Sequence, residues 1–313
     1  MEALDRGEIT LETKIPCSEN AASMGGSQIW LDTREELTVD EMLKAICVVS
    51  ANDCTVAMAE YLAGSQESFV EKMNDRAKEL GMNDTTFKNC HGIDEDGHVT
   101  SANDISLMSR ELLTKHPNIT KYTTIWMDSL RDGRSGLVNT NKLIRNYSGA
   151  TGLKTGSTSI ALYNLSASAT RDGLSLIAVI MRAPTSKVRF SEAQKLLDYG
   201  FSNYSYKELA KKGETVQTII VEKGTQPTVD AIYEKDVGRL IKKGKGKDIT
   251  QSIELNDNIS APIKEGDTLG IVKFLDGDNQ IETVNLVASK NVEKIGLWNM
   301  VTSLYKKWFN LTR

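Results

Sequence analysis

Three consecutive residues near the middle of the chain, Lys154-Thr155-Gly156, combine a cation, a hydroxyl and a residue without a side chain. Two Ser-x-Asn motifs lie upstream, Ser50-Ala51-Asn52 and Ser101-Ala102-Asn103. A lysine can hold a carboxylate, a serine hydroxyl can relay a proton, and glycine lets another backbone approach a strand. In this order the motifs are typical of acyl transfer by a serine hydroxyl.

The attacking serine of such chemistry is absent from the position where the pattern requires it. A Ser-x-x-Lys motif is expected ahead of the other two. The sequence contains this motif only after Lys-Thr-Gly, at Ser303-Leu304-Tyr305-Lys306. Serine three residues before lysine is common on a polar helix face, so we assign this copy no catalytic role.

Both Ser-x-Asn motifs are also good candidates for helix N-caps. Serine and asparagine side chains accept hydrogen bonds from the free N–H groups of a first helical turn. An aspartate follows each motif, Asp53 in one case and Asp104 in the other. Local sequence does not separate a cap from a functional serine, and capping is expected as a second role of Ser50.

Residues 38–115 are predicted to be helical. Thr38-Val39-Asp40-Glu41 is a capping box, followed by apolar residues at helical spacing. Three more helices are expected, at about 53–63, then before Gly81, and at 101–115.

The periodicity then changes from helix to strand. Two β-rich runs, 162–169 and 174–182, are separated by Asp172-Gly173, which is a hairpin signal. A helix is predicted over 187–199, ended by Gly200. Helices followed by an antiparallel hairpin and a closing helix predict an α/β sandwich.

Two further regions follow this α/β domain. Short β runs separated by glycines predict a small all-β domain over 205–293. The segment 294–313 has the pattern of an amphipathic helix, with Trp298 and Trp308 beside lysines. Such a helix suits the membrane interface, and the alternative is a helix docked on its own protein. We therefore divide the chain at 1–204, 205–293 and 294–313.

Composition excludes several classes of protein. The chain has 313 residues, 40% hydrophobic and 26% charged, with a formal net charge of -4, so nucleic-acid binding has little support. No run approaches the ~20 apolar residues that span a bilayer.

The four cysteines are Cys17, Cys47, Cys54 and Cys90. They lack Cys-x-x-Cys spacing, so we expect mostly buried thiols. Cys90, His91 and His98 would supply only three of the four ligands that a structural zinc site needs. We therefore expect no metal and no cofactor.

Several stretches in one consistent order carry a resemblance to a known family. They are 21–27, 37–53, 73–82, 89–92 and 152–156. Through them the chain resembles the serine-type D-alanyl-D-alanine carboxypeptidases, which are low-molecular-mass penicillin-binding proteins. The resemblance implies a penicillin-binding/β-lactamase-like transpeptidase domain of α/β class, a small all-β C-terminal domain and a terminal amphipathic helix.

The resemblance also implies roles for the upstream motif. Ser50 corresponds to the family's Ser-x-Asn position and Ser101 does not. Ser50 would relay a proton to the departing amine, and Asn52 would direct its carboxamide at the substrate. An arginine near the end of the hairpin is expected to face the substrate carboxylate, and Arg182 and Arg189 are both candidates.

The downstream motif would bind the substrate. By the resemblance, Lys154 and Thr155 meet the terminal carboxylate of a peptidoglycan stem peptide that ends in D-Ala-D-Ala. Gly156 would let the peptide lie beside the strand, and the N–H of Ser157 would be half of the oxyanion hole.

In the family, Ser-x-x-Lys opens a helix that ends shortly before the segment matched by 2–7. We therefore expect the transpeptidase domain to be incomplete at its N-terminus, with the nucleophile, the first strands and a signal peptide missing. The implied function is a hydrolase that removes the terminal D-alanine by acyl-enzyme chemistry, outside the cytoplasmic membrane, with β-lactams as inhibitors. This chain is expected to be inactive. The alternative is a non-catalytic protein that binds stem peptides or a partner in the same cleft, and a β-lactamase is a rival within the enzyme class.

Overall fold

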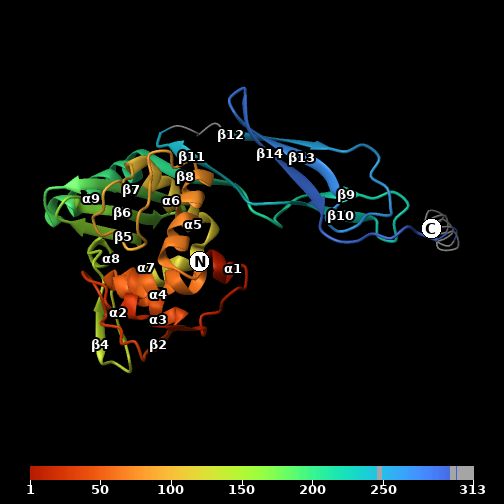
Figure 1. Ribbon diagram of the computed structural model, residues 1–313. Helices are drawn as coiled ribbons and strands as arrows, with labels where there is room; N and C mark the ends of the chain where they lie inside the picture. Colours follow the sequence, from red (N-terminus) through yellow and green to blue (C-terminus); the bar gives the residue numbers. More distant parts are fainter. Residues whose placement is uncertain (245–248, 297–300, 302–313) are drawn as a thin grey trace. The chain divides into compact units, whose positions relative to one another are not determined.

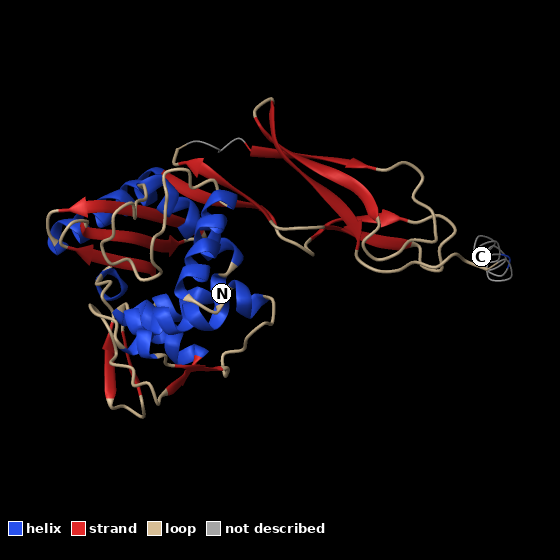
Figure 2. Cartoon of the chain, in the orientation of Figure 1, coloured by secondary structure: helices blue, strands red, loops and turns tan. Residues whose placement is uncertain are grey.

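The computed structural model describes residues 1–244, 249–296 and Val301, and the chain divides into two compact units (Figure 1). The N-terminal unit is Met1–Ser202 and the C-terminal unit is Asn203–Arg313. Figure 2 shows that the first unit mixes helices and strands, whereas the described part of the second is built almost entirely of strands.

The elements of the N-terminal unit alternate between short strands and longer helices. They are α1 (Glu2–Asp5), β1 (Lys14–Pro16), α2 (Glu19–Ala22), β2 (Glu36–Thr38), α3 (Val39–Val49), α4 (Asn52–Ala63), α5 (Gln66–Glu79), α6 (Ala102–Lys115), the 3-10 helix η1 (Pro117–Ile119), α7 (Thr120–Thr123), β3 (Met127–Leu130), β4 (Ser135–Val138), α8 (Leu143–Asn146), β5 (Ala150–Thr158), β6 (Leu162–Arg171), β7 (Leu174–Ala183) and α9 (Ser186–Asn203).

The predicted helix ends are largely confirmed by their caps. Thr38 Oγ1 accepts from Glu41 N at 3.3 Å, and Glu41 Oε2 accepts from Thr38 N at 2.9 Å, which completes the capping box of α3. Gly64 ends α4 in the left-handed conformation. Ser101 Oγ accepts from Asp104 N at 3.2 Å at the start of α6, so this serine is a structural cap.

The sheet of the N-terminal unit has three antiparallel strands in the order β5-β6-β7. The predicted hairpin is confirmed, since Asp172 and Gly173 both have positive φ between β6 and β7. Strand β5, which carries Lys-Thr-Gly, lies at an edge of this sheet. Its outer backbone groups are therefore not paired with another strand of the sheet.

The predicted end of α9 at Gly200 is wrong. The helix continues to Asn203, and Gly200 is buried inside it. A Cβ at this position would lie 2.4 Å from Leu176 Cδ1 on β7. The glycine therefore allows close packing of helix on sheet and does not stop the helix.

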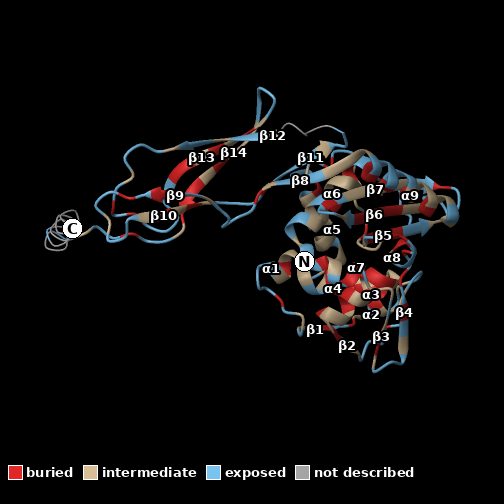
Figure 3. Cartoon of the chain, turned by 180° about the vertical axis from the view of Figure 1, so that it is seen from behind, coloured by how far each residue is buried: buried red, intermediate tan, exposed pale blue. Residues whose placement is uncertain are grey.

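The main core of the N-terminal unit lies around α3 and α4, where Figure 3 shows dense buried residues. The fully buried side chains Val39, Met42 and Val48 come from α3, and Val56 comes from α4. This packing holds the α3–α4 junction, where Ser50 and Asn52 lie, as a rigid corner.

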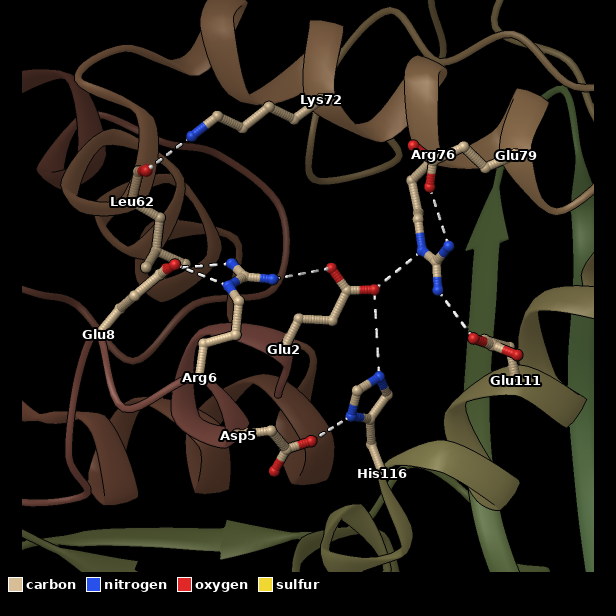
Figure 4. A network of polar contacts seen from close by, with 10 residues as sticks. All are labelled: Glu2, Asp5, Arg6, Glu8, Leu62, Lys72, Arg76, Glu79, Glu111 and His116. Carbon is tan, nitrogen blue, oxygen red and sulfur yellow. Dashed lines mark hydrogen bonds and ion pairs between the residues drawn. The ribbon is translucent and has the colours of Figure 1, made fainter.

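Helix α1 is joined to the rest of the unit by a polar network (Figure 4). Arg76 of α5 pairs with Glu2 at 2.9 Å and with Glu111 of α6 at 2.8 Å. His116, just after α6, contacts the carboxylate of Asp5. The network connects three helices through charge-assisted hydrogen bonds.

The described C-terminal unit is all-β, as predicted. Its strands are β8 (Tyr204–Ala210), β9 (Thr215–Ile220), β10 (Thr228–Tyr233), β11 (Val237–Lys242), β12 (Ile249–Leu255), β13 (Thr268–Asp276) and β14 (Asn279–Ala288). Five form an antiparallel sheet in the order β12-β13-β14-β10-β9, and β8 pairs with β11. Val229, Val272 and Leu286 lie at the centre of its core.

The predicted amphipathic helix over 294–313 lies outside the described residues from 297 onward, apart from Val301. Lys294 forms a β-bridge with Gly224, and Ile295 N donates to Lys223 O at 2.8 Å. The first residues of this segment therefore belong to the β structure. Within the part of the chain that the structure describes, no helix has the length and apolar character needed to cross a membrane.

Candidate active site

Ser50 lies in the tight corner between α3 and α4. Its backbone is left-handed, with φ 64° and ψ 41°, a conformation that is uncommon for residues other than glycine. The predicted capping role is wrong, because the N-cap of α4 is Ala51, with no side-chain cap. No described residue hydrogen-bonds to the Ser50 hydroxyl, so it is available to a ligand.

Asn52 is buried at the start of α4 and holds the loop that precedes β2. Its Nδ2 donates to Gly25 O at 2.8 Å, and its backbone N donates to Ser27 O at 2.8 Å. A Cβ at Gly26 would lie 2.8 Å from Asn52 Nδ2. The loop therefore determines where the amide of Asn52 points.

The next residue, Asp53, holds the same loop further along. It is fully buried, and its carboxylate accepts from Ile29 N and from Leu31 N, each at 3.1 Å. The sequence presented Asp53 only as part of a capping pattern, and the structure gives it a tertiary role. The corner that contains Ser50 and the loop 25–31 therefore form one hydrogen-bonded assembly.

Lys154 on β5 is a half-buried cation. Its Nζ donates to Thr155 O at 2.8 Å, and no carboxylate of the described chain pairs with it. Burial lowers the pKa of Lys154 to about 8, and the nearby Arg189 acts in the same direction. Cys47 of α3 is the nearby acidic group, but burial raises the pKa of its thiol to about 11, so it is neutral at pH 7. Among the described residues, the Lys154 ammonium therefore has no anionic partner.

A single threonine joins the Lys-Thr-Gly strand to the end of α3. Thr140 N donates to Val48 O at 3.0 Å, and Thr140 Oγ1 shares a hydrogen bond of 2.7 Å with Thr155 Oγ1. Val48 lies two residues before Ser50. This bridge places Thr155 of β5 close to the last turn of α3.

The two candidate arginines have different surroundings. Arg189 is buried, and its Nη1 donates to Gly156 O at 3.2 Å and to Asn164 O at 3.1 Å. Its Nε is buried without a hydrogen-bond partner in the described structure. Arg182 is exposed at the end of β7. Arg189 is therefore the arginine that contacts the Lys-Thr-Gly strand.

The remaining sequence candidates lie elsewhere. His91 Nδ1 accepts from Ile93 N at 3.2 Å, and His98 Nδ1 accepts from Lys88 N at 3.3 Å, so both histidines serve their loop. Across residues 1–244 and 249–296, no cluster of His, Cys, Asp and Glu could hold a metal ion. Cys17, Cys47 and Cys54 are buried free thiols, as expected, and Cys90 is half-buried. Ser303 lies outside the described residues.

Comparison with known proteins identifies the family. Residues 1–185 match the D-alanyl-D-alanine carboxypeptidase family, which is more than half of the chain. The chain belongs to the D-alanyl-D-alanine carboxypeptidase family. Residues 204–294 match the C-terminal domain of penicillin-binding protein 5. The resemblance seen in the sequence is thus confirmed.

Individual relatives agree with this assignment. D-alanyl-D-alanine carboxypeptidase DacF of Bacillus subtilis (strain 168) is 44% identical over 313 residues, covering 98% of this chain and 80% of the relative. Penicillin binding protein 5 from Haemophilus influenzae has a TM-score of 0.69 and 30% identity, covering 94% of this chain and 86% of its own. Penicillin-binding protein D2 from Listeria monocytogenes, bound to ampicillin, has a TM-score of 0.58 and 30% identity, covering 64% and 81% of the two chains.

Three residues around the candidate site were missed by sequence reasoning. Thr140 forms the bridge between β5 and α3, Asp53 holds the loop, and Gly26 leaves room for Asn52. The polar run Asn139-Thr140-Asn141 between apolar residues is the signal that could have drawn attention to the first. The other two act through contacts between segments more than twenty residues apart, which no local pattern reveals.

Proposed function

We propose that β5 and the α3–α4 corner form the two sides of a cleft, and that this cleft binds peptidoglycan stem peptides that end in D-Ala-D-Ala. The observation that carries this proposal is the Thr140 bridge, which joins the last turn of α3 to Thr155. It is supported by the half-buried ammonium of Lys154, because such a cation without a carboxylate partner favours an anionic ligand.

Strand β5 supplies the recognition half of the proposed site. Lys154 would attract the terminal carboxylate, and the Thr155 hydroxyl would donate to it when Thr140 donates to Thr155. Gly156 and Ser157 are exposed on an edge strand, so the peptide backbone can add to the sheet there. The N–H of Ser157 would supply one donor of the oxyanion hole.

The α3–α4 corner supplies the second half. The Ser50 hydroxyl, free of other partners in the described chain, would pass a proton to the departing amine. The Asn52 amide would contact the peptide group of the substrate. Arg189 would stabilise the Lys-Thr-Gly strand by donating a hydrogen bond to Gly156 O.

The family reaction consists of two acyl transfers. A serine hydroxyl attacks the carbonyl of the penultimate D-alanine, an ester forms, and the terminal D-alanine leaves with the relayed proton. Water then cleaves the ester. No Ser-x-x-Lys precedes Lys-Thr-Gly in residues 1–313, so we infer that this chain by itself binds the peptide without forming the ester. The same observation favours the second candidate, a non-catalytic protein that binds stem peptides or a partner in this cleft.

Three finer assignments follow from the family and from the sequence. The D2 relative has been observed with ampicillin and with cefotaxime bound, which supports β-lactam binding in this cleft. Stem peptides lie in the cell wall, so we place the protein outside the cytoplasmic membrane. The sequence pattern of 294–313 supports attachment to the outer face of the cytoplasmic membrane by an amphipathic helix.

Labelling with a fluorescent penicillin tests the proposed chemistry. The purified chain is expected to show no labelled band on a denaturing gel and no release of D-alanine from a tripeptide ending in D-Ala-D-Ala. The same tripeptide is expected to raise the melting temperature of the chain. A labelled band that disappears in Ser303→Ala would show that the nucleophile had been misplaced. Release of D-alanine by the purified chain would exclude the second candidate, the non-catalytic binding protein.

A further inference from the structure

Trp30 is an aromatic side chain held away from the protein. It is 76% exposed, while its neighbours Ile29 and Leu31 are 6% and 5% exposed. Its backbone is left-handed, with φ 60°, which is a strained conformation for a bulky residue. Backbone strain persists only where the surroundings enforce it, and it occurs most often at sites with a function.

The loop around Trp30 is held from two sides. Asp53 accepts the N–H groups of Ile29 and Leu31, each at 3.1 Å. Arg131, in the turn between β3 and β4, donates to Ile29 O at 2.8 Å and to Trp30 O at 3.3 Å. The buried side chains on either side therefore point inward, and the indole between them is presented to solvent.

Trp30 lines a shallow pocket of about 550 Å³ that is wide open to solvent. Its other lining residues are Asp32, Arg34, Glu35, Arg131 and Arg134.

The charges of this pocket do not cancel. Asp32 pairs with Arg34 at 2.9 Å, and Glu35 pairs with Arg131 at 2.6 Å. Arg134 donates from Nε to Arg131 O at 2.9 Å, and no carboxylate in the described chain pairs with it. Arg134 therefore leaves one excess positive charge beside the exposed indole.

The pocket is linked to the candidate active site through a short stretch of chain. Ser27 O accepts from Asn52 N at 2.8 Å, and Trp30 follows Ser27 by three residues. Three residues span at most about 11 Å when fully extended. Trp30 is therefore within reach of a part of the substrate that extends beyond the D-Ala-D-Ala end.

We propose that the Trp30 pocket binds the glycan strand that carries the stem peptide, with a sugar ring stacked on the indole and acyl oxygens of the strand accepting hydrogen bonds from Arg134. This inference rests on the proposed function, because the stem peptide is attached to that strand. An indole offers a flat apolar face to the C–H face of a sugar, and guanidinium groups donate to carboxylates and carbonyls. An anionic lipid surface is a poorer match, since it attracts basic clusters and this pocket contains two carboxylates.

Glycan without stem peptides separates this inference from the proposed function. We would titrate the full chain by calorimetry with a neutral oligomer of N-acetylglucosamine and with glycan strands freed of peptide by an amidase, which exposes an additional carboxylate on alternate sugars. Trp30→Ala is expected to weaken binding of both by about tenfold, the order expected for loss of an aromatic contact. Arg134→Gln is expected to weaken binding of both as well, by roughly threefold to fivefold, because the acyl oxygens are present in both oligomers.

Matched surface variants serve as controls. Tyr61→Ala removes an aromatic side chain that is 45% exposed, and Arg110→Gln removes an exposed arginine, so both are expected to bind like wild type. Trp30→Phe keeps an aromatic ring and is expected to retain most of the affinity if Trp30→Ala does not fold. Absence of glycan binding by the wild type, or equal binding by folded Trp30→Ala or Arg134→Gln, would overturn the inference. Binding to anionic vesicles but not to glycan would also overturn it. Tripeptide binding, measured separately, reports on the proposed function alone.

Discussion

Asn52 depends on a glycine that leaves it little room. Gly26 has φ +80°, and a Cβ there would meet Asn52 Nδ2 at 2.8 Å. The amide is the free end of its side chain, so it can turn away from an added methyl group. In doing so it would lose its hydrogen bond to Gly25 O and its orientation in the cleft.

Gly26→Ala is therefore expected to damage binding more than stability. The left-handed backbone costs an alanine roughly 1 kcal/mol in the folded state. We expect a similar loss of unfolding free energy in Gly64→Ala, where φ is +84° and a Cβ would meet nothing within 4 Å. Only Gly26→Ala is expected to weaken binding of a D-Ala-D-Ala tripeptide, by calorimetry. Equal affinity of the two variants for the tripeptide would contradict the role given to Asn52.

At the scale of residues, the functional side chains that belong to known motifs could be predicted from the sequence. Those that act through tertiary contacts could not. Ser50, Asn52 and Lys154 stand in recognisable motifs. Thr140 and Asp53 do not, because their partners are Thr155 and the loop around Ile29. Ser50 was expected to cap α4, but the chain turns through a left-handed residue at that point, so the cap position passes to Ala51.

At the scale of elements, the close contact of α9 with β7 makes a second prediction. Alanine is a better helix former than glycine by about 1 kcal/mol, so Gly200→Ala should stabilise an isolated helix. In this protein the added methyl group would meet Leu176 Cδ1 at 2.4 Å. Overpacking of this kind costs about 1–3 kcal/mol, so we expect a net loss of stability in chemical denaturation.

The double variant Gly200→Ala/Leu176→Ala supplies the control. Removing the Leu176 side chain empties the space that the new methyl group needs. We expect Gly200→Ala to be neutral or stabilising in the Leu176→Ala background and destabilising in wild type. An additive result would show that the two residues are not in contact.

Long periodic elements were predicted well and short ones were not. Helices α3 to α6 and the β6–β7 hairpin have caps, turn residues and apolar spacing that predict them. The three-residue strands β1 and β2 carry too little pattern, and they pair only because the fold brings them together. Gly200 was predicted to end α9, but the helix continues to Asn203 because the glycine packs against Leu176 of β7. In strands β8, β11 and β12 buried and exposed residues do not alternate cleanly, so the sequence carries little signal for them.

At the scale of the whole molecule, the two units have separate cores. We therefore expect two transitions in differential scanning calorimetry. The N-terminal unit is expected to unfold at the lower temperature, because its sheet has three strands with an unpaired edge at β5. The C-terminal unit has a five-stranded sheet.

A fragment of residues 203–294 checks which transition belongs to which unit. It is expected to fold alone and to reproduce the higher transition of the full chain. One cooperative transition at high temperature for the full chain, with an unfolded fragment, would contradict independent units.

The account depends most on Lys154 as the group that receives the substrate carboxylate. Burial places its pKa at about 8, below the usual value for lysine. The ammonium is therefore charged below pH 8 and loses its charge as the pH rises through this value. Affinity for a carboxylate should be constant at low pH and decline above about pH 8. Lys154→Arg keeps its charge across this range and should show no decline.

The most direct test is the affinity of the chain for a tripeptide ending in D-Ala-D-Ala, measured by calorimetry from pH 6 to 9.5. We predict binding that weakens above pH 8, and a loss of about tenfold to a hundredfold at pH 7 in Lys154→Met, as for removal of a charge-assisted hydrogen bond. The same tripeptide with an amidated C-terminus should bind as weakly to wild type. Equal affinity of wild type and Lys154→Met for the free-acid tripeptide, or no binding by wild type, would contradict the account.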